Sequence, residues 1–65
     1  MPHVQITLLE GRTPEQKRRV VERITQTLVE EIGTNRENIS IAFLEVTPAC
    51  FSLGGMLMLD RKKSP

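Results

Sequence analysis

The sequence predicts an α/β fold: a single β-α-β unit with parallel strands, followed by a C-terminal hairpin-like segment. Three observations support this prediction. An alternating segment opens the chain, a long amphipathic segment with helix-start and helix-stop residues follows, and a second segment of strand length comes after it. Because a helical crossover joins parallel strands and is almost always right-handed, we expect the two strands to lie parallel in one sheet.

The first strand is predicted over residues 2–9. Pro2 can begin a strand because no ladder hydrogen bond needs to be donated there. Apolar side chains then alternate with polar ones, as expected for a strand with one buried face, at Val4, Ile6 and Leu8. The Glu-Gly-Arg sequence of residues 10–12 ends the alternation and predicts a short loop.

A helix is predicted from about Pro14 to Ile32. Thr13 suits the N-cap, Pro14 suits the first helical position, and Gln16 completes a capping box with Thr13. Gly33 suits the position that follows the last turn. Helical spacing places a mostly apolar set of side chains on one side, namely Lys17, Val20, Val21, Ile24, Leu28 and Ile32.

The second strand is predicted over residues 39–46, and it is largely apolar at both even and odd positions. A strand that is apolar on both faces needs cover on both faces. The helix covers only one, so we expect the other face to meet another subunit and the chain to oligomerise through its sheet. The short chain of 65 residues favours the same conclusion, because a domain of this size buries only about 60% of its unfolded surface.

The last part of the chain divides into two segments. Residues 51–59 are apolar and are interrupted by Gly54 and Gly55, which predicts a hairpin-like segment that lies on a neighbouring subunit. Residues 60–65 form a charged tail that we expect to be frayed. Residues 1–65 therefore make one small domain.

Composition excludes several classes of function. Nine Lys and Arg against eight Asp and Glu give a net charge of +1, which provides no strong field for nucleic acid or an anionic membrane. No apolar run approaches the roughly 20 residues that span a bilayer, and no secretory signal opens the sequence. One His and one Cys cannot supply four zinc ligands, and the single Cys50 fits a reducing compartment. We expect a cytoplasmic protein without nucleic-acid or membrane partners.

Two residues near the N-terminus carry potential chemistry. Removal of the initiator Met1 would leave Pro2 with a free secondary amine, whereas retention of Met1 would leave a tertiary amide that cannot act as a base. Such an amine is a candidate base if nearby positive charge and exclusion of water hold its pKa near neutral. Arg12 offers a planar fork for a substrate carboxylate. His3, in contrast, is expected to be an exposed strand residue without a catalytic role.

Taken together, these features resemble the 4-oxalocrotonate tautomerase family. The resemblance rests on Pro2, on the Leu-Leu-Glu-Gly-Arg end of the first strand, on the Thr-Pro-Glu-Gln-Lys helix start, and on the Phe-Ser-Leu-Gly-Gly sequence at residues 51–55. It extends from Pro2 to about Leu59, and chain length and element order match as well. The sequence is therefore identified as a member of this family, with the tautomerase fold.

The resemblance implies an assembly, a reaction and a set of site residues. Members of the family form dimers, and three dimers assemble into a hexamer; they use no metal or organic cofactor. The amino-terminal proline moves a proton within an unsaturated 2-hydroxy or 2-oxo carboxylic acid such as 2-hydroxymuconate or phenylenolpyruvate. By this resemblance Pro2 is the base and Arg12 binds and polarises the substrate through its carboxylate. Phe51 lines the pocket, often from a neighbouring subunit, and Leu9 lies near the substrate through its backbone.

Ser40 departs from the family pattern. The best-known members carry a second arginine in the second strand, and the corresponding position, eleven residues before Phe51, is Ser40. A hydroxyl can bind substrate but cannot replace a guanidinium, and loss of one such donor corresponds to about 2–4 kcal/mol in the transition state. Arg36 and Arg61 are the candidates for compensation. The departure puts high activity on 2-hydroxymuconate in doubt, although not tautomerase activity itself.

Two alternatives remain open at this point. The same proline can activate water for addition to, or dehalogenation of, an unsaturated acid, but this chemistry usually needs an extra carboxylate near the proline. The chain can also be a low-activity or non-catalytic structural subunit of a hetero-oligomer, in which a tautomerase paralogue supplies the missing arginine. Ser40 and the two-faced second strand motivate the second alternative.

Overall fold

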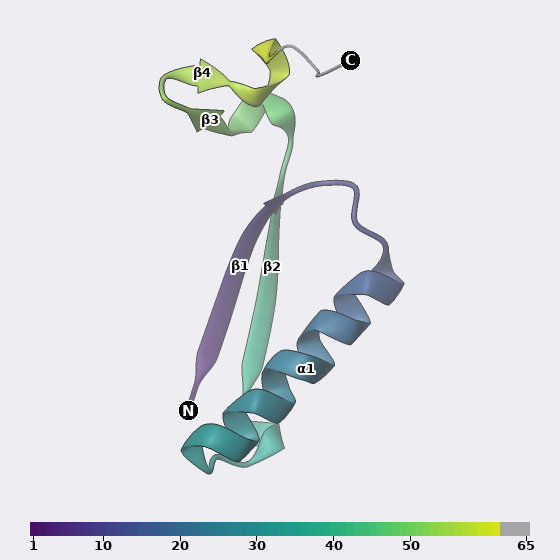
Figure 1. The fold of residues 1–65 in the computed structure, drawn as a ribbon, viewed down its shortest axis with the longest axis vertical. Coiled ribbons are helices and arrows are strands. Elements are labelled where there is room, and N and C mark those ends of the chain that lie inside the picture. Colours follow the sequence, from purple (N-terminus) through teal and green to yellow (C-terminus); the bar gives the residue numbers. More distant parts are fainter. Residues whose placement is uncertain (62–65) are drawn as a thin grey trace.

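The computed structural model describes residues 1–61 and confirms the β-α-β unit and the small hairpin that follows it (Figure 1). Three-residue 3-10 helices lie at residues 36–38, 48–50 and 58–60. The strands and the helix are β1 (His3–Leu9), α1 (Pro14–Ile32), β2 (Ser40–Val46), β3 (Ser52–Leu53) and β4 (Met56–Leu57).

β1 and β2 form a two-stranded parallel sheet, as predicted from the helical connection between them. The register pairs His3 with Ser40 at one end and Leu9 with Val46 at the other. One further backbone bond, from Glu10 N to Val46 O at 2.9 Å, extends the ladder beyond β1. The two strands therefore begin at one end of the sheet and finish together at the opposite end.

Local chemistry sets both ends of α1. Thr13 Oγ1 accepts a hydrogen bond from Gln16 N at 3.1 Å, and Thr13 N donates to Gln16 Oε1 at 3.0 Å, which completes the predicted capping box. At the other end Gly33 adopts φ 71°, and its N–H donates to Val29 O at 3.2 Å. The helix therefore begins and ends at the residues that the sequence predicted.

Removal of the N-cap provides a test of this local control. We expect Thr13→Ala to lower the free energy of unfolding by about 1 kcal/mol, because the Gln16 N–H loses its acceptor. Thr27→Ala is the matched control: Thr27 lies inside α1, where its hydroxyl donates to Arg23 O at 2.9 Å, and alanine is the better helix former. Denaturant unfolding at one fixed protein concentration measures both; equal stability of the two variants would contradict the prediction.

The hairpin consists of β3 and β4, which pair antiparallel through Ser52 with Leu57 and Leu53 with Met56. Gly54 and Gly55 have φ angles of 59° and 85°, a pair of left-handed residues that a two-residue turn requires and that other residues adopt with strain. The predicted hairpin-like segment is thus confirmed. Of the predicted tail 60–65, Asp60 belongs to the last 3-10 helix and residues 62–65 lie outside the described residues.

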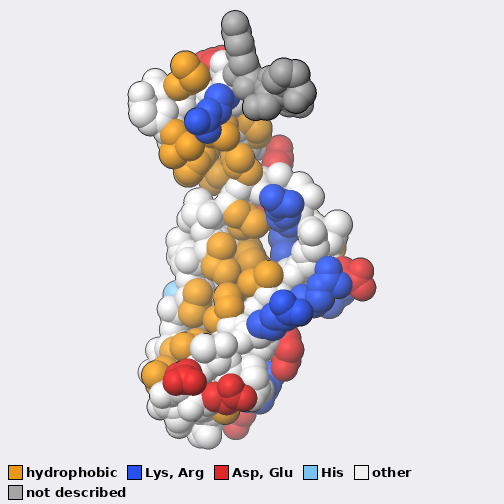
Figure 2. Space-filling view, viewed as in Figure 1, with side chains coloured by type: hydrophobic (Ala, Val, Ile, Leu, Met, Phe, Trp, Pro, Cys, Tyr) orange, Lys and Arg blue, Asp and Glu red, His pale blue; other side chains and the backbone are white. Residues whose placement is uncertain are grey.

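α1 covers one face of the sheet and leaves the other face open. Half-buried residues alternate along both strands, and they belong to the face toward α1: Val4, Ile6, Leu8, Ile41 and Phe43. The opposite face carries exposed side chains, His3, Gln5, Thr7, Ser40, Ala42 and Leu44. Figure 2 shows a band of hydrophobic side chains along the molecule, bordered by a row of Lys and Arg side chains.

No side chain among residues 1–61 is fully buried, so the part of the chain that the structure describes has no enclosed core. The apolar side of α1 is not covered at its C-terminal end, where Ile32 is 61% exposed. On the face of the sheet that points away from α1, Leu44 is 50% exposed. The radius of gyration is 15.4 Å, whereas a compact chain of this length has one of about 11 Å. The fold is that of an elongated unit with apolar surface available for association.

Candidate active site

The structure separates the residues that the sequence nominated into two groups at opposite ends of the sheet (Figure 1). β1 contains seven residues, and a strand rises about 3.3 Å per residue, so its ends are roughly 20 Å apart. Pro2 and Arg12 therefore do not meet within one chain. The group at the start of the strands consists of Pro2 and Ser40, and the group at their end of Leu9, Arg12 and Phe51.

Pro2 and Ser40 are joined directly. Ser40 N donates a hydrogen bond to Pro2 O at 3.1 Å, which ties the start of β2 to the residue that precedes β1. The Ser40 side chain in turn contacts the His3 ring, with Oγ 2.7 Å from Nδ1. His3 is exposed, as predicted, but it is part of this group, which the sequence analysis missed. Only the strand register, a non-local feature, brings the two side chains together.

Arg12 lies at the opposite end, in the loop between β1 and α1. Its side chain lines a hollow of about 290 Å³ together with Leu8, Gln16, Lys17, Val20 and Phe43. The hollow has an apolar wall from the strands and a polar rim from the first turns of the helix. Within residues 1–61 the Arg12 guanidinium makes no ion pair, so it can receive an anionic group.

Lys17 also lines this hollow and adds a second cation to it. The sequence predicted Lys17 only as a member of the mostly apolar side of the helix. Its Nζ lies 2.6 Å from Glu45 Oε1 and 5.9 Å from the centre of the Phe43 ring. The Glu45 carboxylate neutralises Lys17, whereas Arg12 has no such partner in the described part of the chain. Of the two cations, Arg12 is therefore the one available to a substrate carboxylate.

Leu9 and Phe51 lie at the same end of the sheet as Arg12. Leu9 is the last residue of β1, is half-buried and lies opposite Val46. Phe51 is also half-buried, between the 3-10 helix at residues 48–50 and β3, and its carbonyl accepts a hydrogen bond from Met58 N at 2.8 Å. Its ring does not line the Arg12 hollow.

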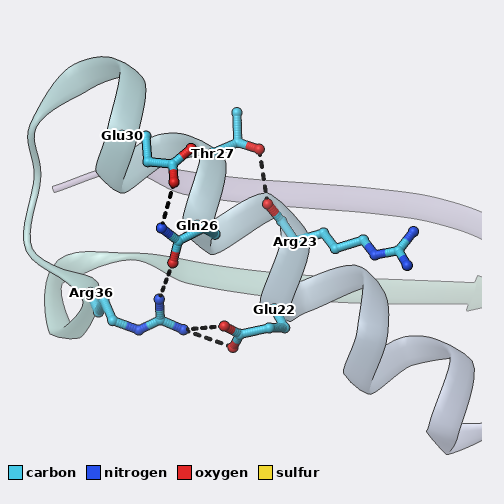
Figure 3. Close-up of polar contacts among 6 residues, drawn as sticks. All are labelled: Glu22, Arg23, Gln26, Thr27, Glu30 and Arg36. Carbon is cyan, nitrogen blue, oxygen red and sulfur yellow. Dashed lines mark hydrogen bonds and ion pairs between the residues drawn. The ribbon is translucent and has the colours of Figure 1, made fainter.

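The two arginines considered as substitutes at Ser40 are engaged elsewhere. Figure 3 shows Arg36 turned back onto α1, where its Nη2 lies 2.7 Å from Glu22 Oε2 and its Nη1 lies 2.9 Å from Gln26 Oε1. Arg61 Nη1 lies 3.8 Å from Met58 Sδ, in the hairpin region. Neither side chain approaches Ser40 in this structure, so the suggested compensation within one chain does not occur.

The described residues show neither a metal-binding cluster nor a membrane-spanning helix. Residues 1–61 hold no group of three or more His, Cys, Asp or Glu side chains that could bind a metal ion. Over the same residues, no helix has both the length and the apolar character needed to cross a bilayer. Cys50 is exposed.

Comparison with known proteins identifies the family. The family model described as "Tautomerase enzyme" matches residues 2–61. The 2-hydroxymuconate tautomerase of Bacillus subtilis (strain 168) is 37% identical over 60 residues, which cover 92% of this chain and 97% of the relative. A probable tautomerase of Bacillus cereus is 36% identical over 61 residues, covering 94% of this chain and all of the relative.

Solved structures agree with these relatives. A crystal structure of a 4-oxalocrotonate tautomerase homologue superimposes with a TM-score of 0.89 at 35% identity, covering 97% of this chain and 100% of that one. A heterohexamer 4-oxalocrotonate tautomerase from Chloroflexus aurantiacus has a TM-score of 0.87 at 26% identity, with coverage of 95% and 100%. The family predicted from the sequence is confirmed: the chain belongs to the tautomerase family and is an isomerase.

Proposed function

We propose that this chain is a keto–enol tautomerase in which Pro2, freed of Met1, is the general base. The substrate class is a small unsaturated 2-hydroxy or 2-oxo carboxylic acid, 2-hydroxymuconate-like or phenylenolpyruvate-like. The observation that carries the proposal is the position of Pro2. Its carbonyl is fixed by Ser40 N at 3.1 Å, and a small residue such as Pro2 after the initiator Met1 favours removal of that Met.

The reaction needs one proton carrier and no change of oxidation state. The Pro2 amine takes the proton from the 2-hydroxyl of the enol, and the electron pair of that O–H bond forms the C=O bond. The double bonds shift along the conjugated chain, and the Pro2 ammonium returns the proton to a carbon atom. Arg12 binds the carboxylate in a bidentate manner and draws charge away from the reacting carbons.

A second copy of the chain supplies the half of the site that one copy lacks. If two copies associate antiparallel about a two-fold axis, the end of one sheet lies beside the start of the other. Pro2 and Ser40 of one subunit then face Leu9, Arg12 and Phe51 of its partner, and the symmetry creates two equal sites. We propose a homo-oligomer built on this pairing, a hexamer made of three dimers, which would also cover the exposed apolar surface.

Ketonisation assays test the proposed activity. We expect protein whose intact mass corresponds to a chain starting at Pro2 to convert the enols 2-hydroxymuconate and phenylenolpyruvate to their keto forms. The loss of enol absorbance measures this conversion. Protein that retains Met1, as shown by intact mass, should be inactive because its Pro2 nitrogen is an amide. Failure of correctly processed protein to accelerate either reaction over buffer would refute the proposal.

One observation favours a second candidate, a low-activity or non-catalytic subunit of a hetero-oligomer with a tautomerase paralogue. Ser40 replaces the arginine that the resemblance implies, and Arg36 and Arg61 both have other contacts. The relative from Chloroflexus aurantiacus is itself described as a heterohexamer. Native mass spectrometry of protein isolated from its own cell separates the candidates: two subunit masses support the hetero-oligomer, and one supports the homo-oligomer.

A further inference from the structure

His3 and Ser40 lie at the start of the sheet, next to the proposed base Pro2. Ser40 contributes twice: its backbone N–H donates to Pro2 O at 3.1 Å, and its Oγ lies 2.7 Å from His3 Nδ1. The parallel register pairs His3 with Ser40, so the two side chains lie on the same face of the sheet. Both side chains are exposed in the single chain, at the end of the sheet where the proposed base lies.

The contact with Ser40 determines which ring nitrogen of His3 remains available. A neutral imidazole has one N–H and one acceptor nitrogen, and a partner at one nitrogen selects the tautomer. A hydroxyl that donates to Nδ1 places the proton on Nε2, the tautomer that histidine favours in water. The Nε2–H group then faces away from Ser40, one residue after Pro2, and no side chain among residues 1–61 binds it.

The Nε2–H group of His3 can stabilise the charge that develops on the substrate during proton transfer. When the amine removes a proton from the enol, negative charge develops on the oxygen at carbon 2 and spreads along the conjugated carbons, and hydrogen-bond donors at this oxygen lower the barrier. Among the described residues the cations Arg12 and Lys17 lie at the far end of the sheet, and Arg36 is bound to α1. Within the described part of the chain, His3 supplies a side-chain donor one residue from Pro2.

We propose that His3 Nε2–H binds the 2-oxo acid end of the substrate and that Ser40 orients the imidazole for this contact. The proposal rests on the proposed function of Pro2 and adds His3 to Pro2 and Arg12 as a further substrate-contacting residue. In it, His3 donates a hydrogen bond and transfers no proton to carbon. Ser40 acts through His3 as a positioning residue.

Kinetic comparison of His3 variants tests the contact. We expect His3→Leu to lower kcat for ketonisation about 10-fold to 100-fold, because one neutral donor to the developing charge is lost. His3→Gln retains an N–H donor near the position of Nε2 and should recover part of this loss. Gln5→Ala, the next exposed side chain on the same face of β1, is the control and should leave kcat unchanged while the assembly, checked by native mass, stays intact.

The kinetic result distinguishes failure of this inference from failure of the proposed function. If Pro2→Ala removes activity while His3→Leu leaves kcat and KM unchanged, His3 makes no useful contact and the inference is wrong, although the Pro2 mechanism stands. If processed wild-type protein shows no turnover, the proposed function itself is wrong. A measurement that does not depend on turnover then tests whether His3 contacts the 2-oxo acid.

Nitrogen NMR provides that measurement, because the chain contains one histidine and its ring signals need no further assignment. We expect the Nε2–H tautomer at pH 8 in the wild type and a shift toward a tautomer mixture in Ser40→Ala. Addition of 2-oxoadipate, a saturated 2-oxo diacid, should shift the Nε2 signal in the wild type and less in Ser40→Ala. An Nδ1–H tautomer, or an Nε2 signal unmoved by saturating 2-oxoadipate, would overturn the inference.

Discussion

Pro2→Ala is expected to lower kcat/KM for ketonisation by about 10²-fold to 10⁴-fold, the range that general-base catalysis contributes. The substitution leaves a primary amine on a flexible residue in place of a secondary amine held by the ring. It keeps the hydrogen bond from Ser40 N, because that bond is accepted by the backbone carbonyl of residue 2. Stopped-flow or steady-state absorbance of the enol measures the effect, and intact mass must show that Met1 has been removed.

A second variant controls for any disturbance by Pro2→Ala. A short N-terminal extension keeps the Pro2 side chain and converts its nitrogen to an amide, so activity should be absent. Cleavage that leaves Pro2 as the first residue should restore activity to the wild-type value. The mechanism is refuted if the extended chain is as active as the cleaved one, or if Pro2→Ala with a correct terminus retains full turnover.

Arg12→Ala is expected to lower kcat/KM by about 10²-fold to 10³-fold, because a charge-assisted bidentate contact to the substrate carboxylate is removed. Arg12→Lys should recover only part of the loss, since an ammonium lacks the planar fork. Arg19→Ala is the control, because Arg19 lies exposed on α1 outside the Arg12 hollow. Equal kinetics of Arg12→Ala and Arg19→Ala would remove Arg12 from the site.

Mixing the two inactive variants tests whether the site is shared between chains. Pro2 and Arg12 lie at opposite ends of β1, so each site is proposed to take one residue from each of two subunits. If Pro2→Ala and Arg12→Ala chains are unfolded together and reassembled in equal amounts, about a quarter of the sites receive both intact residues. Activity near a quarter of wild type is therefore expected. No recovery, with mixed oligomers verified by native mass, would show that the site lies within one chain.

The sequence predicted the helix to the residue because its ends are set by contacts a few residues apart. Thr13 and Gln16 satisfy each other, and Gly33 ends the helix by its own backbone conformation. The parallel pairing followed from the length of the connection. These features depend on local chemistry, which a single sequence contains in full.

The site was harder to predict because its geometry depends on register and on strand direction. The sequence predicts His3 as an exposed strand residue, and only the pairing of His3 with Ser40 gives it a partner. Arg36, four residues before Ser40, was a candidate to compensate for it, but its guanidinium contacts Glu22 instead. The separation of Pro2 from Arg12, in contrast, follows from the length of the strand that the sequence predicts between them.

The lack of a fully buried side chain among residues 1–61 has a consequence for how the protein is maintained in a cell. If copies of the chain cover one another's apolar surface, as proposed, folding and association form one equilibrium governed by mass action. The folded fraction then rises with the amount of chain present. The rate of synthesis would then set how much chain is folded. At low concentration the chains would be exposed to proteolysis, and at high concentration assembly would protect them.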